Sequence, residues 1–341
     1  MVRKFVLIIF IGLLLGAYFP PEFVREYERE MAIQAMKDGK PDQALVVFNI
    51  LRFQRDPVGI NNYYALLYHN ATNEPIDEKK QVRAQAELAW REAAASGVGA
   101  AAWNLAMLHI KYGRQDRWHD DIATRRLKEA QELGVEDASK LLSTGKGDLS
   151  RIKVLVDMGD RGAAMDWASK MHYRGNQAQK IRALKIAANS GSVAAMADLG
   201  AELRQKKHSP NHKVKKWLVK AAEMGSITAA RRLGDCYNFQ RDFCRSRDAQ
   251  RAAFWYEKAL GPVVYFTPPQ IMFDDEHVLR LGSKPRWYRK PHNVQKSAAY
   301  ELGRLYMIGD GIEKDRARAI MLFQRAGGWK DARELVNVLS R

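Results

Sequence analysis

The stretch KAAEMGSITAARRLG, residues 220–234, follows the same pattern as KIAANSGSVAAMADLG, residues 185–200. Each stretch has an alanine-rich helix end, a glycine, a pair of alanines and a Leu-Gly step. The glycines at the helix ends, Gly191 and Gly225, lie 34 residues apart, and so do the two Leu-Gly glycines. A fixed period of this length is typical of a solenoid of stacked helix pairs, a fold that usually binds other molecules and does no chemistry itself.

The glycines of this pattern fall into two groups with different expected roles. The first group follows helix ends, where a left-handed backbone is needed and glycine has no side chain to clash. It consists of Gly191, Gly225 and Gly261. The second group falls inside predicted helices, where glycine costs about 1 kcal/mol against alanine, so we expect the partner helix to approach closely there. It consists of Gly200, Gly234 and Gly303.

This pattern resembles the Sel-one-like repeat (SLR) family, whose members are relatives of tetratricopeptide repeats. The clearest match is residues 297–326, where AYELGRLY at 299–306 precedes GDGI at 309–312. The match is also good over residues 192–261. The resemblance implies an α/α superhelix that mediates protein–protein interaction, often in bacterial envelopes, and it implies no catalytic residues.

We therefore predict an all-α chain, an α/α superhelical solenoid of SLR- and TPR-like helix pairs with an N-terminal signal-anchor helix and one loop insertion. Near the N-terminus, Gly39 is predicted to end one helix and Pro41 to begin the next, as in a tetratricopeptide turn. The predicted parts are 1–21, a signal anchor or signal peptide; 22–96, TPR-like helix pairs; 97–261, the SLR solenoid; 262–296, a basic aromatic insertion; and 297–341, a C-terminal SLR with a capping helix.

The first 20 residues are predicted to be a targeting segment. Arg3 and Lys4 precede an uncharged apolar run at 5–19, which is shorter than the ~20 residues of a spanning helix but typical of a signal sequence. No small residue stands two places before Ala17, so an uncleaved signal anchor is favoured over a removed signal peptide. Basic residues before the run and glutamates after it place the N-terminus in the cytoplasm and the solenoid in the periplasm, as a single-pass protein of a bacterial inner membrane. The alternative is a soluble periplasmic or secreted protein after cleavage.

The chain has two cysteines, Cys236 and Cys244, placed near the predicted turn between two helices. In an exported chain they would close this turn as a disulfide, and two free thiols are the alternative. Their spacing suits no common metal motif.

Positive charge is concentrated in one part of the chain. The net charge is +17, and residues 200–296 hold 20 Lys and Arg against 9 Asp and Glu. Such a field raises the local concentration of anionic partners. Outside the cytoplasm these are an acidic protein, an acidic polysaccharide or anionic lipid, and nucleic acid is not expected. The partner-binding candidates are Lys215, Lys216, Arg231 and Arg232, with solvated helix faces as the alternative interpretation.

The period breaks once, because Gly261 and Gly327 lie 66 residues apart, where one repeat needs roughly 34. The extra residues, 262–296, combine aromatic rings with cations, a set that suits sugar stacking, anion contact or a protein hot spot. Two interpretations stay open: partner binding, and a structural plug packed against the concave face of the solenoid. The candidates for binding are Tyr265, Phe266, Phe273, Arg286, Trp287, Tyr288, Arg289 and Lys290.

No catalytic, cofactor or metal site is predicted. The histidines are scattered, no nucleophile–base set is visible, and the Gly-Lys-Gly at 145–147 lacks the other residues of a phosphate-binding loop. The predicted function is a non-catalytic scaffold or adaptor that mediates protein–protein interaction in a bacterial envelope complex. The alternative is a component of polysaccharide export or envelope maintenance that binds an acidic glycan directly.

Overall fold

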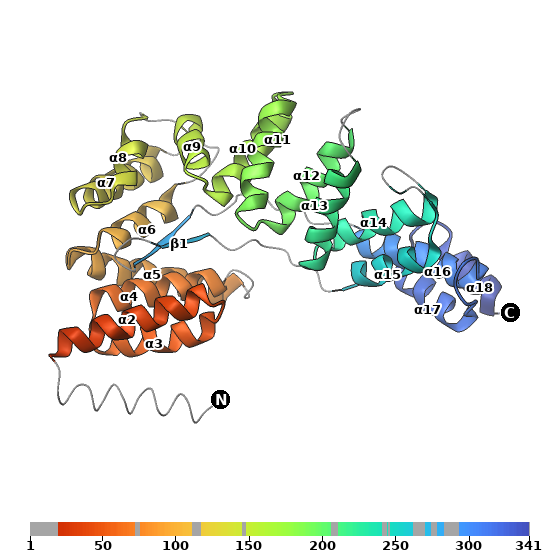
Figure 1. The fold of residues 1–341 in the computed structure, drawn as a ribbon, viewed down its shortest axis with the longest axis horizontal. Coiled ribbons are helices and arrows are strands. Elements are labelled where there is room, and N and C mark those ends of the chain that lie inside the picture. The colour runs from red at the N-terminus through yellow and green to blue at the C-terminus, as the bar shows by residue number, and fades with distance from the viewer. Residues whose placement is uncertain are drawn as a thin grey trace. The chain divides into compact units, whose positions relative to one another are not determined.

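The computed structural model describes residues 20–71, 76–110, 117–144, 148–205, 211–240, 244, 246–261, 270–273, 278–282 and 293–340. Over these residues the chain forms 17 helices, and within each of two units described below consecutive helices pack against one another (Figure 1). The prediction of an all-α solenoid of helix pairs is therefore confirmed. One small antiparallel hairpin lies within the insertion, and the sequence analysis did not predict it.

The chain divides into two compact units. Unit 1 contains residues 1–158 together with 268–284, and unit 2 contains residues 159–267 together with 285–341. The division falls inside the range 97–261, which the sequence predicts as one solenoid. The middle of the predicted insertion belongs to unit 1, and its last residues form the start of α16 in unit 2.

Unit 1 contains four helix pairs and the hairpin. Its helices are α2 (Pro21–Lys37), α3 (Pro41–Phe53), α4 (Pro57–Asn70), α5 (Ile76–Ala95), α6 (Gly99–His109), α7 (Arg117–Glu132), α8 (Glu136–Leu142) and α9 (Asp148–Asp157). Its strands are β1 (Ile271–Phe273) and β2 (Leu279–Leu281). Trp90 of α5 and Trp103 of α6 are the largest fully buried side chains of its core.

Unit 2 contains the stretches that carry the 34-residue period. Its helices are α10 (Arg161–Tyr173), α11 (Gln177–Asn189), α12 (Val193–Gln205), α13 (Asn211–Glu223), α14 (Ile227–Phe239), α15 (Ala249–Ala259), α16 (Val294–Ile308), α17 (Arg316–Ala326) and α18 (Ala332–Ser340). Tyr256 of α15 and Phe323 of α17 are fully buried between these helices.

Helices in both units begin at capping side chains. In unit 1, Asp56 Oδ2 accepts from the Gly59 N–H at 3.1 Å and from Arg29 Nε at 2.9 Å. In unit 2, Ser226 Oγ accepts from the Ala229 N–H at 3.2 Å. Each cap satisfies one of the main-chain N–H groups that the first helical turn leaves without a partner. Asp56 also joins α4 to α2, because its carboxylate is fully buried against Arg29.

The predicted role of the glycines at helix ends is confirmed at two positions and wrong at the third. Gly191 and Gly225 have φ values of +87° and +92°, in the left-handed region. Gly261 is not in that region. Helix α15 ends instead through short-range bonds, in which the Leu260 N–H donates to the Glu257 carbonyl at 3.0 Å and the Gly261 N–H donates to the Lys258 carbonyl at 3.2 Å. The helix therefore tightens at its end, and no left-handed residue is needed.

The glycines inside helices allow close packing, as the sequence predicts. A Cβ atom at Gly234 would lie 2.5 Å from the Tyr256 ring, and one at Gly303 would lie 3.0 Å from the Phe323 ring. The nearest atoms thus belong to side chains of the following helix rather than to its backbone. Each glycine makes room for a large ring that fills the space between two helices.

Among the described residues, no helix is both long enough and apolar enough to cross a membrane. The predicted signal anchor lies outside the described residues except at its last positions.

Candidate protein-interaction surfaces

Two helices of unit 1 hold the second strand of the hairpin through polar side chains. Asn61 and Asn62 lie in α4, and Trp103 and Asn104 lie in α6. We call the surface formed by these four side chains the amide face, and β2 packs against the two helices that carry it. All four side chains are buried, so their polar atoms need partners within the protein.

The amide face binds both main-chain polar groups of Leu279. The Leu279 N–H donates to Asn62 Oδ1 at 2.8 Å. The Leu279 carbonyl accepts from Asn61 Nδ2 at 3.0 Å and from Asn104 Nδ2 at 3.2 Å. Further bonds join the asparagines, because Asn61 Nδ2 donates to Asn62 Oδ1 and Asn104 Nδ2 donates to Asn61 Oδ1, each at 3.0 Å. The three carboxamides therefore form one connected network.

Leu281 is bound in the same way two positions later. Its N–H donates to Asn104 Oδ1 at 2.7 Å, and its carbonyl accepts from Trp103 Nε1 at 2.9 Å. On the other side of β2, the Gly282 N–H donates to the Gln270 carbonyl at 2.7 Å. In an antiparallel pair only every second residue exchanges main-chain bonds with the partner strand. The main-chain groups of Leu279 and Leu281 are therefore directed to the amide face, which takes the place of a third strand.

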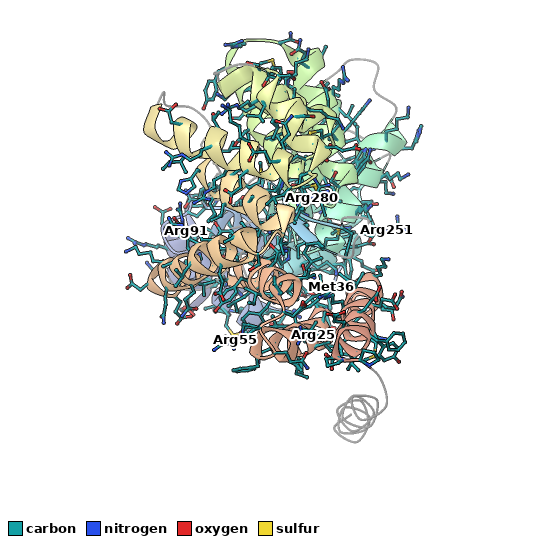
Figure 2. All side chains as sticks on the ribbon, turned by 90° about the vertical axis from the view of Figure 1, so that its left-hand side faces the viewer. Arg25, Met36, Arg55, Arg91, Arg251 and Arg280 are labelled. Atoms are coloured by element: carbon teal, nitrogen blue, oxygen red, sulfur yellow. A yellow bond between two sulfur atoms is a disulfide. The ribbon has the colours of Figure 1, made fainter. Side chains whose placement is uncertain are left out.

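The residue between these two leucines is recognised by charge and by an aromatic ring. The Arg280 guanidinium lies 5.2 Å from the centre of the Trp103 ring, and its Nη1 lies 3.2 Å from Asp137 Oδ2 in α8; Figure 2 labels Arg280. Burial alone would raise the pKa of Asp137, but the hydrogen bond from Lys140 and the charge of Arg280 outweigh it and hold this pKa below its ordinary value. The carboxylate is thus ionised opposite the arginine.

The amide face was not predicted from the sequence. Its signal is present in the sequence, because an Asn-Asn pair at 61–62 and Trp103-Asn104 interrupt helices that are otherwise rich in apolar residues. Buried amides are almost always hydrogen-bonded, so such positions predict a polar partner. They do not reveal that the partner is a strand near position 280.

Most aromatic and cationic candidates of the insertion lie outside the described residues: Tyr265, Phe266, Arg286, Trp287, Tyr288, Arg289 and Lys290. Phe273 is described, and its side chain in β1 is 42% exposed. The part of the insertion that the structure describes, at 270–273 and 278–282, is packed against α4 and α6. Both interpretations of the insertion, partner binding and a plug against the concave face, stay predictions.

The basic candidates of unit 2 separate into two kinds. Lys215 and Lys216 are exposed on α13. Arg231 pairs with Asp235 at 2.5 Å on the same helix. Arg232 donates to the main-chain carbonyl of Ala197 in α12 at 2.9 Å, and burial lowers the pKa of its guanidinium. Arg232 therefore joins two helices and Arg231 pairs within one, whereas the two lysines are exposed, and their role in partner binding stays a prediction.

An aromatic ring lies beneath the cations of unit 2. Lys215 Nζ and the Arg251 guanidinium each lie 5.6 Å from the centre of the Tyr237 ring, from helices α13 and α15. We call Lys215, Lys216, Tyr237 and Arg251 the tyrosine patch; Figure 2 labels Arg251. Both Lys215 and Arg251 are exposed, so the patch presents positive charge to solvent above a buried ring.

A second surface of unit 2 is a groove between α15 and α17. It has a volume of about 510 Å³ and is lined by Glu257, Leu260, Gly261, Leu302, Arg318, Met321, Leu322 and Arg325. Arg318 pairs with Glu257 at 2.6 Å, and Arg325 donates to the Leu260 carbonyl at 2.6 Å. Met321 is 61% exposed in this groove. Among the described residues, no three His, Cys, Asp or Glu side chains gather where they could hold a metal ion.

Cys236 and Cys244 are joined by a disulfide in the structure. Cys236 is near the end of α14, and Cys244 lies in the segment before α15. Both are buried. The Asp248 N–H donates to the Tyr237 carbonyl at 3.0 Å, which also ties the start of α15 to the end of α14.

Three stretches of unit 2 match the model of the Sel1 repeat family, at residues 215–226, 227–260 and 296–327. No curated protein matches the chain. Among solved structures, a Sel1 repeat protein from Oxalobacter formigenes is 18% identical, with 89% of this chain and 98% of that chain covered and a TM-score of 0.42. A protective antigen with an SLR fold, present in uropathogenic Escherichia coli strains, is 16% identical, with 94% and 80% covered and a TM-score of 0.36. Sel1 repeat proteins are generally scaffolds for protein interaction, and this chain carries Sel1 repeats between residues 215 and 327.

Proposed function

We propose that this protein is a non-catalytic adaptor that joins protein partners in a bacterial envelope complex. The observation that carries the proposal is the tyrosine patch, which lies within two of the matched Sel1 repeats. A cation above an aromatic ring attracts a carboxylate and also offers a flat apolar surface, as protein hot spots do. An acidic segment of a partner protein fits this combination.

The envelope location is supported by three features. The apolar run at 5–19 follows two basic residues, as in a signal anchor or a signal peptide. The disulfide between Cys236 and Cys244 suits an oxidising compartment. The basic region 200–296 then serves to steer anionic partners, because in the periplasm nucleic acid does not compete for it.

Export is tested with the full chain and a reporter fused after Arg341. A reporter that works only in an oxidising compartment should be active, and one that works only in the cytoplasm should not. Activity of the cytoplasmic reporter alone would show that the solenoid is not exported.

Partner binding is tested by placing a photo-crosslinking residue at position 216 and irradiating intact cells. We expect crosslinks to one or a few envelope proteins. The yield of crosslinked product should fall at least fivefold when Lys215→Glu is added. The matched control is Lys80→Glu, which reverses an exposed lysine on α5 in unit 1 and should leave the crosslinks unchanged. Equal loss in both variants would show that net charge, and not the tyrosine patch, recruits the partner.

The second candidate function is direct binding of an acidic glycan. The Tyr237 ring and the cations of the tyrosine patch favour it as well. Glycan retention on the purified chain should weaken steeply as salt rises, because surface attraction is screened beyond about 10 Å at 0.1 M salt. A folded protein partner also buries apolar surface and should be retained at moderate salt. Retention of glycan alone, lost in Lys215→Glu, would replace the adaptor proposal with direct glycan binding.

A further inference from the structure

The amide face of unit 1 recognises a polypeptide main chain. Five of the hydrogen bonds that Asn61, Asn62, Asn104 and Trp103 make join them to the N–H or carbonyl of Leu279 or Leu281. Every residue except proline carries the same two groups. These bonds therefore require an extended strand in a fixed register but do not require one particular sequence.

Side chains of β2 add a pattern to this main-chain recognition. Leu279 and Leu281 are buried, as is Val278 before them. Arg280 contacts the Trp103 ring and pairs with Asp137. The amide face thus suits an extended segment with apolar residues at alternate positions and a cation between them.

The strand is supplied from outside the helix stack of unit 1. The nearest helices along the chain are α15, which ends at Ala259, and α16, which begins at Val294, and both belong to unit 2. The described residues of the segment between these two helices, 270–273 and 278–282, belong to unit 1. In unit 1 the segment therefore behaves as a bound ligand that the same chain provides.

Buried carboxamides make the amide face unsuited to other occupants. An apolar surface placed on Asn61, Asn62 and Asn104 would leave several donors and acceptors without partners, at a large free-energy cost. Their spacing matches two alternate residues of a strand, so a second strand satisfies them as β2 does. A helix does not, because its main-chain groups are already bonded within it.

We propose that the amide face is a binding site for an extended segment of a partner protein with an apolar–basic–apolar pattern, and that residues 278–282 occupy it until such a segment replaces them. This site is separate from the tyrosine patch, and either can fail without the other. Residues 278–282 compete for the amide face as part of the same chain, so their effective concentration is in the millimolar range. The apparent affinity for a partner segment is therefore much weaker while the chain's own strand is in place.

The test uses the full chain and a fluorescent peptide with the sequence of residues 276–284, EHVLRLGSK. The variant Leu279→Asp with Leu281→Asp cannot bury its own strand. We expect it to bind the peptide at least tenfold more tightly than the wild-type chain, measured by fluorescence anisotropy. A control peptide with aspartate at both leucine positions should not bind.

A third substitution tests whether the peptide occupies the amide face. Asn104→Ala, added to the double variant, removes bonds to both bound residues and should weaken peptide binding at least tenfold. Lys80→Glu on α5, added to the same background, should not change it. Equal peptide binding by the wild-type chain and the double variant would show that the peptide binds elsewhere, and it would overturn the proposal.

A milder variant covers the case in which the double variant does not fold. Arg280→Glu places two carboxylates together at Asp137 and weakens the chain's own strand without removing a leucine. A chain with this change that is helical by circular dichroism should also bind the peptide more tightly than wild type. If neither folded variant binds the peptide, residues 278–282 are a structural plug and the proposal is wrong.

Discussion

Asn104 in α6 accepts a hydrogen bond from the main-chain N–H of Leu281, which lies 2.7 Å away and 177 positions later in the chain. The same carboxamide donates to the Leu279 carbonyl, so one buried side chain fixes two residues of β2. This bond joins the first helices of the solenoid to the segment that interrupts its repeat period. Strand β2 of the interruption is therefore part of the packing of unit 1.

We expect Asn104→Ala to destabilise unit 1 by about 2–4 kcal/mol. The substitution leaves two buried groups, the Leu281 N–H and Asn61 Oδ1, without the bonds that they make to Asn104. Each such loss costs about 1–3 kcal/mol. The free energy of unfolding in urea, followed by tryptophan fluorescence, measures this loss. Asn70→Ala, at an exposed position on α4, is the control and should change it by less than about 0.5 kcal/mol. Similar values for the two variants would show that the amide network contributes nothing to stability.

We expect Gly234→Ala to destabilise unit 2, although alanine is the better helix former. The new Cβ would lie 2.5 Å from the fully buried Tyr256 ring, so atoms in the core would have to shift. Overpacking of this kind costs about 1–3 kcal/mol, which exceeds the gain of about 1 kcal/mol in helix propensity. Gly303→Ala should cost less, because its nearest ring atom is at 3.0 Å. Thermal unfolding of both variants tests this order, and stabilisation by Gly234→Ala would contradict it.

The stability of unit 2 should fall at alkaline pH because of Tyr256. Burial, and then the negative charge of Asp235, raise the pKa of its phenol above the ordinary value of 10.0; its hydroxyl donates to Asp235 Oδ1 at 2.9 Å. Below pH 10 the phenol is protonated in both states, so its contribution to stability is fully present. Above pH 10 only the unfolded chain loses this proton, and the free energy of unfolding falls by up to about 1.4 kcal/mol per pH unit.

The matched variant for this prediction is Tyr256→Phe. It lacks the titrating group but keeps the buried ring, so the stability difference between it and the wild-type chain should shrink as pH rises above 10. The two chains share every other ionisable group, so the comparison isolates the Tyr256 phenol. A difference that stays constant from pH 8 to pH 11 would show that the Tyr256 phenol titrates normally.

The helix pairs were predictable because their signals are local. The period between Gly191 and Gly225, the left-handed backbone at these glycines and the capping residues all act within a few positions of the chain. Such signals recur in each repeat and support one another. The same reasoning was wrong at Gly261, since α15 ends by tightening and needs no left-handed residue.

The surfaces could be predicted only in part, because they depend on contacts between distant residues. Arg232 has the sequence pattern of a surface cation, yet it donates to Ala197 in the preceding repeat. The Asn61-Asn62 pair indicates buried amides, but β2 lies more than 200 positions away. A pairing over that separation leaves no periodic signal in the sequence. The aromatic and basic composition of residues 262–296 pointed to the insertion but not to the part of it that packs in unit 1.

We expect Cys236 and Cys244 to be oxidised in the protein isolated from its native compartment. The pair closes a short loop between α14 and α15, and chain-entropy arguments for a loop of this length give about 2.5 kcal/mol of stabilisation. Alkylation in denaturant without reductant should label neither cysteine, and added reductant should lower the free energy of unfolding of unit 2 by about that amount. The double variant Cys236→Ser with Cys244→Ser should unfold identically with and without reductant, because no other cysteine is present. Labelling of both thiols before reduction would exclude the disulfide and remove one of the three supports for export.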